Sequence, residues 1–215
     1  MGERRSLFRW LTLPAAEPDT PQDFFARLPV IETDRLILRK MRMSDTSDVH
    51  RYAKDPEVAR HVLWEAHRST FETRAYIRYL LYQYRSGLPG SWGIVLKETG
   101  RVVGTIGYMS YTSDNAMVEV GYSLSREHWG QGLMTEALTA VIDETFRVLK
   151  LHRIEAMHFT DNPASGRVMQ KCGMTHEGHL RERINCKGVF RDVEMWAILR
   201  KDWEKTHPDK KQGTA

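Results

Sequence analysis

The chain has 215 residues, of which 41% are hydrophobic and 28% are charged. These proportions are typical of a soluble globular protein, and the length is sufficient for one domain with a sizeable core. The formal net charge of +4 suits an anionic ligand. No basic helix face interleaved with aromatic residues accompanies it, so we expect no direct binding of nucleic acid. No apolar run reaches the ~18 residues of a membrane span, so we expect no membrane association.

Cysteine and histidine usage argues against a disulfide framework and against a metal site. The two cysteines, Cys172 and Cys186, form no Cys-x-x-Cys pair, which favours a reducing compartment. His176 and His179 are the closest pair of histidines, but no third ligand follows at a spacing typical of metal sites. We therefore predict a cytoplasmic protein without a metal cofactor.

The two ends of the chain differ from its middle. We assign residues 1–29 to an N-terminal extension, residues 30–203 to one domain and residues 204–215 to a polar C-terminal tail. The apolar patch near the N-terminus is interrupted by Arg9 and followed by Glu17 and Asp19. It is too short and too charged for a signal sequence, so we expect one short amphipathic turn within residues 7–11.

Hydrophobic periodicity and turn residues predict eleven elements between these ends. In chain order they are a strand, two helices, three strands, a helix, a strand, a helix and two strands. They span about residues 31–41, 44–55, 69–86, 92–96, 101–110, 116–124, 132–149, 153–160, 162–173, 176–184 and 189–199. This order describes an α+β fold. Because a helix joins the strands at 118–124 and 153–160, we expect these strands to be parallel neighbours.

A turn with two glycines precedes the long helix at 132–149. Gly130 and Gly132 lack side chains where an incoming anion would approach the backbone. The first N–H groups of a helix have no partners within the helix, and the helix dipole is positive at that end. The turn is therefore a candidate cradle for the phosphates of a pyrophosphate-bearing cofactor.

A second motif follows about thirty residues later, where Asn162-Pro163-Ala164-Ser165 opens a helix that ends before Gly173-Met174. With Trp129-Gly130-Gln131-Gly132-Leu133-Met134-Thr135-Glu136-Ala137, it resembles the two motifs of the GNAT superfamily of acetyl-CoA-dependent N-acetyltransferases. The resemblance covers residues 31–203. Further segments are similar to the Rim-type branch, which acetylates N-terminal amines of ribosomal proteins: Thr33-Asp34-Arg35-Leu36-Ile37-Leu38-Arg39, Glu119-Val120-Gly121-Tyr122 and Glu177-Gly178.

The resemblance implies a GNAT-like mixed, mostly antiparallel sheet of about six or seven strands. It also implies a central pair of parallel strands that splay apart, with helices on both faces of the sheet. Acetyl-CoA, or CoA after the reaction, would be bound as co-substrate by the glycine turn, by the strand before it and by the second motif. The residues implied are Tyr122, Leu124, Trp129, Gly130, Gln131, Gly132, Leu133, Met134, Thr135, Asn162 and Arg167.

Four positions depart from the superfamily pattern. Trp129 stands where the superfamily has Arg or Gln, and Met134 stands where it has Gly or Ala. Met169 occupies the position of a Tyr that protonates the departing thiolate in many members, and Met cannot donate a proton. Met174 replaces the usual Phe, which we expect to affect packing only.

The resemblance implies direct attack of a substrate amine on the thioester. A matching glutamate is the base in the Rim-type branch, so Glu177 is our first choice, and Glu119 and His158 remain alternatives. Ser165, in the first turn of its helix, is the candidate proton donor to the thiolate, because the helix dipole favours negative charge there. Each of these residues also has a purely structural interpretation.

We therefore expect an N-acetyltransferase that acts on a primary amine, first of all the N-terminal α-amine of a protein or peptide, with a ribosomal-protein N-terminus among the candidates. The alternatives are a small-molecule amine acetyltransferase, for a polyamine or an antibiotic, and a catalytically silent acyl-CoA-binding module. Both a monomer and a homodimer are compatible with the sequence. Aromatic residues in the first half of the chain are candidates to wall the acceptor site, namely Trp64, Phe71, Tyr76, Tyr79 and Tyr82.

Overall fold

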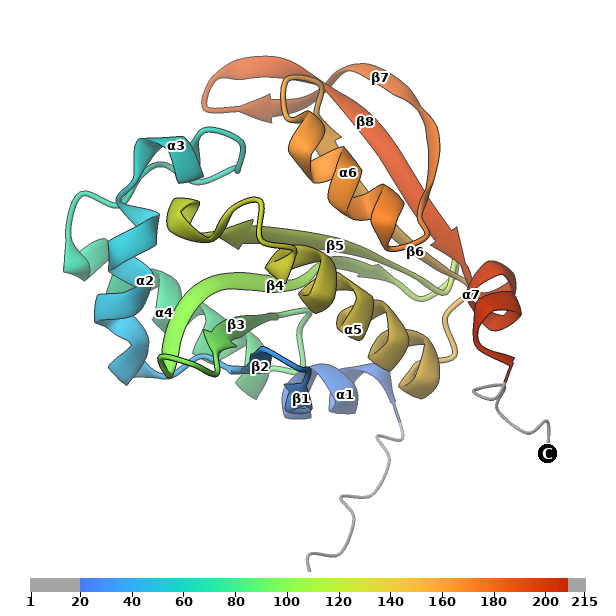
Figure 1. The fold of residues 1–215 in the computed structure, drawn as a ribbon, viewed down its shortest axis with the longest axis horizontal. Coiled ribbons are helices and arrows are strands. Elements are labelled where there is room, and N and C mark those ends of the chain that lie inside the picture. The colour runs from blue at the N-terminus through green and yellow to red at the C-terminus, as the bar shows by residue number, and fades with distance from the viewer. Residues whose placement is uncertain (1–19, 209–215) are drawn as a thin grey trace, which may run out of the picture.

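The computed structural model describes residues 20–208. Within them, one sheet contains eight strands in the order β1-β2-β3-β4-β5-β6-β8-β7 (Figure 1). The strands are β1 (Ile31–Glu32), β2 (Leu36–Lys40), β3 (Ser91–Leu96), β4 (Arg101–Thr112), β5 (Met117–Leu124), β6 (Arg153–Phe159), β7 (Thr175–Cys186) and β8 (Val189–Leu199). The helices are α1 (Pro21–Arg27), α2 (Thr46–Ala53), α3 (Pro56–Ala59), α4 (Thr70–Arg85), α5 (Leu133–Val148), α6 (Pro163–Lys171) and α7 (Arg200–Thr206), with short 3-10 turns η1 (Met43–Asp45) and η2 (Arg126–His128).

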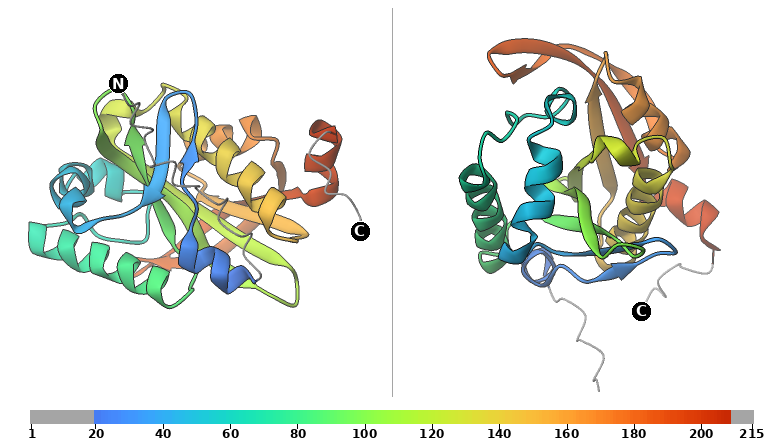
Figure 2. Two further views of the ribbon diagram at one scale, coloured as in Figure 1. Left: turned by 90° about the horizontal axis from the view of Figure 1, so that it is seen from below. Right: turned by 60° about the vertical axis from the view of Figure 1, so that its left-hand side comes forward.

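The predicted fold class is confirmed. Strands β5 and β6 are parallel, as expected from the helix that joins them, and all other neighbouring strands are antiparallel. Helices α2 and α4 cover one face of the sheet, and α5 and α6 cover the other (Figure 2). The sheet has one strand more than the six or seven expected, because the run predicted at 31–41 is interrupted. Thr33 forms a turn there, with its N–H donating to the Leu36 carbonyl at 3.0 Å.

Side-chain caps lie at the starts of two of the predicted helices. The Ser69 side chain accepts from the Glu72 N–H at the start of α4, and Asn162 caps α6 with Pro163 as the first helical residue. The N-cap of α5 is instead Gly132, which has φ +77° and offers no side-chain cap. Its first N–H groups are therefore left without a capping side chain, at the end of the helix that faces the glycine turn.

The core extends into the segment that the sequence analysis assigned to the N-terminal extension. Residues 21–27 form α1, in which Phe24 and Phe25 are each only 1% exposed. Their rings pack edge-on against Trp92 and Tyr108, at centroid distances of 6.5 and 5.3 Å respectively. Helix α1 is thus part of the packed domain, whereas the amphipathic turn expected within residues 7–11 lies outside the described residues.

The C-terminal end of the domain is also fixed by an aromatic side chain. Helix α7 continues past residue 203, and Trp203 is buried against Phe146 of α5. The Trp203 indole N–H donates to Asp143 Oδ1 at 2.7 Å. One aromatic anchor therefore ties the last described helix to α5.

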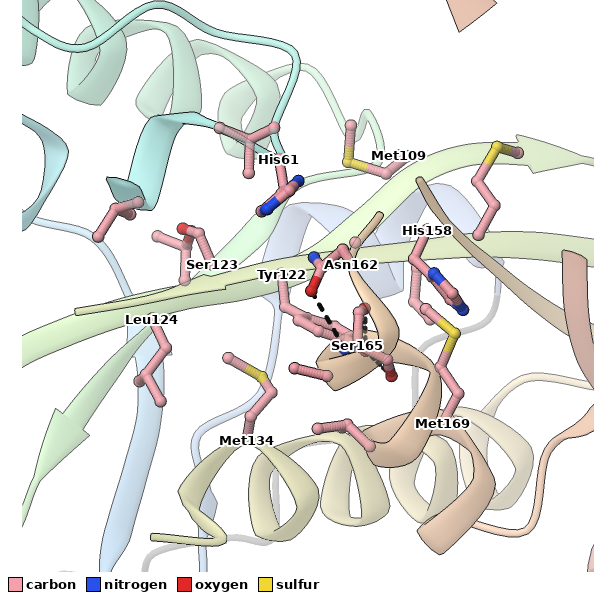
Figure 3. A pocket seen from close by; sticks show the side chains of 18 of the residues that line it. His61, Met109, Tyr122, Ser123, Leu124, Met134, His158, Asn162, Ser165 and Met169 are labelled. Carbon is pink, nitrogen blue, oxygen red and sulfur yellow. Dashed lines mark hydrogen bonds between the residues drawn. The ribbon is translucent and has the colours of Figure 1, made fainter. Parts of the chain in front are cut away.

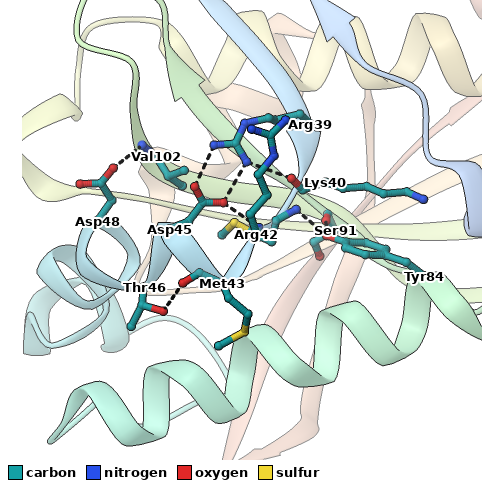
Figure 4. A network of polar contacts seen from close by, with 11 residues as sticks. Arg39, Lys40, Arg42, Met43, Asp45, Thr46, Asp48, Tyr84, Ser91 and Val102 are labelled. Carbon is teal, nitrogen blue, oxygen red and sulfur yellow. Dashed lines mark hydrogen bonds and ion pairs between the residues drawn. The ribbon is translucent and has the colours of Figure 1, made fainter.

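A polar network joins β2 to the elements on the face of the sheet that α2 and α4 cover (Figure 4). Arg39 donates to both oxygens of buried Asp45, each at 2.8 Å, and Asp45 also accepts from the Arg42 N–H at 2.7 Å. Nearby, the Tyr84 hydroxyl of α4 accepts from the Met41 N–H at 3.1 Å. The network satisfies a carboxylate that would otherwise be costly to bury.

The helices between residues 20 and 208 are all too short or too polar to cross a membrane.

Candidate active site

The two parallel strands pair over a short distance only. The register joins Met117 to Arg153, Val118 to Ile154 and Glu119 to Glu155, and no later pair between β5 and β6 occurs within residues 20–208. Strand β5 nevertheless continues to Leu124 and β6 to Phe159. The strands therefore splay apart after Glu119 and Glu155, as the family resemblance implied.

The splay leaves one edge of β5 open. The Ala116 carbonyl accepts from the His152 N–H at 2.7 Å, so this edge faces β6. Backbone polar groups alternate along a strand, so Val120, Tyr122 and Leu124 present theirs to the same edge. The Leu124 carbonyl is occupied by the Trp129 indole N–H at 2.8 Å. The sequence did not reveal this contact, which fixes Trp129 beside the end of β5.

The glycine turn leads from this open edge to α5. Gly130 and Gly132 have φ values of +74° and +77°, a region that is strained for residues with a side chain. A Cβ at Gly130 would have no neighbour within 4 Å. The turn is thus exposed to an incoming ligand, and the unpaired N–H groups of Leu133, Met134 and Thr135 lie at the positive end of the α5 dipole.

A carboxylate in the first turn of α5 holds the glycine turn against the segment between β1 and β2. Glu136 accepts from the Thr33 hydroxyl at 2.5 Å, the Arg35 N–H at 2.9 Å and Arg35 Nε at 2.7 Å. Arg35 Nη1 also donates to the Gln131 carbonyl at 2.9 Å. Burial opposes ionisation of Glu136, but the hydrogen bonds outweigh burial and lower its pKa. The segment Thr33-Asp34-Arg35 therefore braces the glycine turn from a distant part of the chain.

A cavity of about 600 Å³ runs past the open edge of β5 (Figure 3). Its volume lies in the range of small-molecule sites. Most of the predicted site residues line it, namely Tyr122, Leu124, Trp129, Gly130, Gly132, Leu133, Met134, Thr135, Asn162, Ser165 and Arg167. Gln131 and Glu177 do not. The structure thus brings together nearly all of the predicted cofactor contacts, which come from two motifs about thirty residues apart.

Ser165 projects from the first turn of α6 toward β5 (Figure 3). Its Oγ lies 2.9 Å from the Tyr122 hydroxyl oxygen, and the Tyr122 hydroxyl also donates to the Ser165 carbonyl at 3.2 Å. Asn162 Oδ1 accepts from the Ser165 N–H at 3.4 Å, so Asn162 acts as a helix cap and also lines the cavity. Met169 lies one helical turn after Ser165 in α6. It is 1% exposed and lines the same wall of the cavity.

The cavity continues onto the opposite face of the sheet. Side chains alternate along β5, so Glu119 and Ser123 project from the face opposite Tyr122. Gly121 lies between them, and a Cβ there would stand 2.9 Å from the Met109 side chain. Met109 of β4 therefore lies over Gly121 on this face. The cavity thus passes through the gap between the splayed strands.

Apolar side chains from separate elements surround the second opening. Leu63, Tyr79 and Met109 line the cavity while remaining 54%, 58% and 55% exposed. Of the aromatic residues expected to wall an acceptor site, Trp64, Tyr76 and Tyr79 line the cavity, whereas Phe71 and Tyr82 are exposed elsewhere on α4. Sequence analysis missed Leu63 and Met109, because neither belongs to a motif and only the fold brings them together.

The β7–β8 hairpin contacts the end of α3 and the segment that follows it. Lys187 Nζ donates to the Ala59 carbonyl at 2.7 Å, and the Cys186 thiol lies 3.5 Å from the Val62 carbonyl oxygen. His61 lines the cavity close to this contact, and its buried Nδ1 lies 3.5 Å from Asp161 Oδ1. Burial lowers the pKa of His61. The hairpin and the α3 segment together bridge this side of the cavity.

The three candidate bases have different surroundings. Burial and the nearby carboxylate of Glu155 raise the pKa of Glu119, which lines the cavity, while Arg183 lowers it. Glu177 is exposed and forms a two-pronged ion pair with Arg153, one contact being 2.9 Å. That pairing lowers the pKa of Glu177, and the side chain does not line the cavity. The structure therefore does not bring Glu177 to the other site residues.

His158, the third candidate, is 9% exposed and its Nδ1 lies 2.8 Å from the Phe159 carbonyl oxygen. A Cβ at Gly166 would come within 2.5 Å of His158 Nε2. Gly166 therefore permits α6 to pack on His158, at the modest cost of a glycine in a helix interior. This packing explains why the residue after Ser165 is a glycine. Among residues 20–208, no cluster of three or more His, Cys, Asp or Glu side chains is arranged to hold a metal ion.

Comparison with known proteins agrees with this arrangement. The family description "Acetyltransferase (GNAT) domain" matches residues 35–175. The uncharacterized N-acetyltransferase p20 of Bacillus licheniformis is 32% identical over 176 residues, which cover 82% of this chain and 99% of that protein. The [ribosomal protein uS5]-alanine N-acetyltransferase of Escherichia coli is 36% identical over 84 residues, or 39% of this chain and 43% of that enzyme.

Among solved structures, a GNAT-family acetyltransferase from Bacillus anthracis superposes with a TM-score of 0.72 and 27% identity, covering 80% of this chain and 99% of that one. The match to the family extends over the splayed strands, the glycine turn and the whole of the second motif. The chain therefore belongs to the GNAT acetyltransferase family.

Proposed function

We propose that this protein transfers the acetyl group of acetyl-CoA to the N-terminal α-amine of a peptide or protein. The observation that carries the proposal is the single cavity that passes between the splayed strands. It joins the glycine turn and Ser165 on one side to Glu119 on the other. Two substrates can thus reach one reaction centre from opposite faces of the sheet.

The first opening fits acetyl-CoA. The N–H groups of Leu133, Met134 and Thr135 would bind its pyrophosphate, and Arg167 lies within the same cavity wall. The open edge at Val120 and Tyr122 would pair with the amide groups of the pantetheine arm, as an added strand does. When bound, acetyl-CoA supplies a thioester carbonyl that an amine attacks directly.

On the second side, Glu119 is the proposed base. It replaces Glu177, whose carboxylate is held by Arg153 outside the cavity. A free α-amine has a pKa of about 7.7–8.0, so only a modest base is needed near neutral pH, whereas a lysine amine near 10.4 demands more. Glu119 would accept the proton that the amine nitrogen loses, directly or through one water molecule.

Two further functions are required, namely stabilisation of the negative charge on the carbonyl oxygen and assistance to the departing thiolate. A backbone N–H on the open edge of β5 would donate to the carbonyl oxygen as negative charge develops there. Ser165 Oγ would donate to the departing sulfur. A thiol with a pKa near 8.5 is a tolerable leaving group, so a weak donor is sufficient.

The acceptor opening favours a peptide over a polyamine. Leu63, Tyr79 and Met109 give it an apolar rim, and Glu57 and Glu119 are its only two carboxylates among the lining residues within 20–208. A polyamine, with several positive charges, would match a more acidic pocket. A ribosomal-protein N-terminus is the acceptor named for the E. coli relative and is one candidate here. The free Cys172 and Cys186 favour a reducing cytoplasm as the place of action.

The test is release of CoA from acetyl-CoA with four acceptor classes: N-terminal peptides, lysine peptides with blocked N-termini, polyamines and aminoglycosides. We expect turnover mainly with free N-terminal peptides, and a loss of about 10²-fold or less in Ser165→Ala because thiolate departure is only assisted. Turnover confined to polyamines or aminoglycosides would replace the proposal with the small-molecule alternative. Binding of acetyl-CoA without turnover on any acceptor would favour a silent binding module.

A further inference from the structure

The hydroxyl groups of Tyr122 and Ser165 form a pair inside the cavity. The two oxygens are 2.9 Å apart, and Tyr122 reaches α6 from β5 across the cofactor side of the sheet (Figure 3). Both residues line the cavity. The proposed function uses Tyr122 through its backbone only, so its side chain has no function in the mechanism described above. The inference below rests on the proposed function and adds a residue to it.

The surroundings of the two hydroxyl groups bear on which of them donates the hydrogen bond. Each can donate one hydrogen bond and accept two. Both acceptors near the Tyr122 proton belong to Ser165, namely Oγ at 2.9 Å and the backbone carbonyl at 3.2 Å. Burial raises the pKa of Tyr122 well above its usual value, so the hydroxyl keeps its proton and remains a donor at working pH. The single Tyr122 proton can be shared between these two acceptors. With Tyr122 as the donor, Ser165 Oγ accepts, and the Ser165 proton is left to point into the cavity.

We propose that Tyr122 is a positioning residue that directs the Ser165 hydroxyl toward the leaving sulfur. Other neighbours do not supply this function. Asn162 binds the Ser165 N–H and not its hydroxyl, and Met169 on the same wall has no proton to give. The Tyr122–Ser165 pair therefore compensates for Met169, which stands where the superfamily pattern has a proton-donating tyrosine.

The group transfer balances without a net change at either hydroxyl. The amine nitrogen forms a bond to the thioester carbonyl carbon, and the C–S bond breaks with its electron pair going to sulfur. The amine proton goes to Glu119. Ser165 donates a hydrogen bond to the sulfur, Tyr122 donates one to Ser165 Oγ, and both keep their protons until solvent protonates the released thiolate.

Binding of CoA provides a test that needs no acceptor. At about pH 9.5, above the thiol pKa of ~8.5, CoA carries a thiolate that a hydroxyl donor stabilises. The ratio of the Kd of desulfo-CoA to that of CoA is measured by calorimetry for the wild type, Tyr122→Phe, Ser165→Ala and the double variant. We expect a ratio of about ten in the wild type, lower by several-fold in Tyr122→Phe, and near one in Ser165→Ala and the double variant.

Steady-state kinetics provide the second measurement. With an active acceptor, Tyr122→Phe is expected to lower kcat about tenfold while the KM for acetyl-CoA changes less than twofold. The double variant is expected to be no slower than Ser165→Ala, because Tyr122 acts through Ser165. Tyr82→Phe, an exposed tyrosine of α4 away from the cavity, is the matched control and retains wild-type values.

The outcomes separate the two proposals. The role of Tyr122 would be overturned if Tyr122→Phe kept the wild-type ratio of the Kd of desulfo-CoA to that of CoA. It would also be overturned if the losses in kcat multiplied in the double variant, even if peptides are acetylated. A ratio that falls as expected, with no acetylation of any N-terminal peptide, would support the Tyr122–Ser165 pair and refute the proposed acceptor. A wild type that does not distinguish CoA from desulfo-CoA would overturn the inference directly. Thermal denaturation of each variant identifies any loss that comes from unfolding.

Discussion

Glu119 and Glu155 form the last residue pair of the parallel ladder between β5 and β6. They project from the same face of the sheet, at the point where the two strands begin to diverge. The mutual repulsion of their carboxylates adds to the effect of burial in raising the pKa of Glu119. A carboxylate with an elevated pKa therefore stands at the entrance to the gap through which the two substrates would meet.

The Glu119→Gln variant tests this placement. We expect kcat/KM for a peptide acceptor to fall by about 10²-fold, because the amide cannot accept the amine proton. Glu177→Gln, which alters the exposed pair with Arg153, is expected to change kcat/KM by less than about threefold. The reverse pattern in the same assay would return the role of base to Glu177.

Glu119 also makes a prediction about stability. Its pKa is higher in the folded than in the unfolded protein, so its favourable contribution is complete below the unfolded pKa of about 4.3 and is lost as pH rises through the folded value. At neutral pH the charged group therefore opposes folding. Glu119→Gln should have a Tm at pH 7 equal to or above that of the wild type, so a lowered Tm would contradict this account of the site.

The contacts between Arg35 and Glu136 predict the opposite dependence of stability on pH. The pKa of Glu136 is lowered on folding, so its contribution is present above about pH 4.3 and is lost as pH falls through the folded value. We expect Glu136→Gln to reduce the free energy of unfolding at pH 7 by about 1–2 kcal/mol, a figure kept small because Arg35 is half-exposed. Urea denaturation of Glu98→Gln, in the exposed β3–β4 turn, is the control, and the difference between the variants should shrink toward pH 3.

The glycine turn offers a matched pair of substitutions. Gly130 and Gly100 both have positive φ, and a Cβ at either would have no neighbour within 4 Å. Gly130→Ala and Gly100→Ala should therefore cost a similar amount of stability, about 1–2 kcal/mol. Only Gly130→Ala should weaken CoA binding, by about tenfold, because its methyl group stands where the phosphates would approach. Equal CoA affinity in both variants would argue against the phosphate cradle.

Met109 tests the acceptor side of the cavity. Met109→Ala should raise the KM for a peptide acceptor several-fold and leave the KM for acetyl-CoA unchanged, because the side chain lies over Gly121 on the face opposite Ser165. The exposed Met43, at the η1 turn, is the matched control as Met43→Ala. A change in the KM for acetyl-CoA alone would show that the two faces of the cavity have been assigned incorrectly.

The fold was predictable because its elements carry strong local signals. Hydrophobic periodicity and turn residues predicted the elements, and the helix that joins the strands at 118–124 and 153–160 predicted the parallel pair. The break at Thr33 was missed because its cause is the distant Glu136, which accepts hydrogen bonds from Thr33 and Arg35. Helix α1 was missed because burial of Phe24 and Phe25 depends on Trp92 and Tyr108, far along the chain.

The two halves of the candidate site differ in how far they could be predicted from the sequence. The cofactor side is built from continuous motifs, so Gly130, Gly132, Asn162 and Ser165 could be named in advance. The acceptor side gathers single residues from α3, α4, β4 and β5, and no spacing in the sequence links them. The surroundings of Glu119 and Glu177 were likewise invisible, since the partners Glu155 and Arg153 come from β6.

The most direct test is mass spectrometry of a peptide that carries both a free α-amine and an internal lysine, after incubation with acetyl-CoA and the wild-type protein near pH 7.5. The account predicts one acetyl group, located on the N-terminal residue by fragmentation, and none when Glu119 is replaced by Gln. Acetylation of the lysine in place of the N-terminus, or N-terminal acetylation that is as fast without the Glu119 carboxylate, would contradict it.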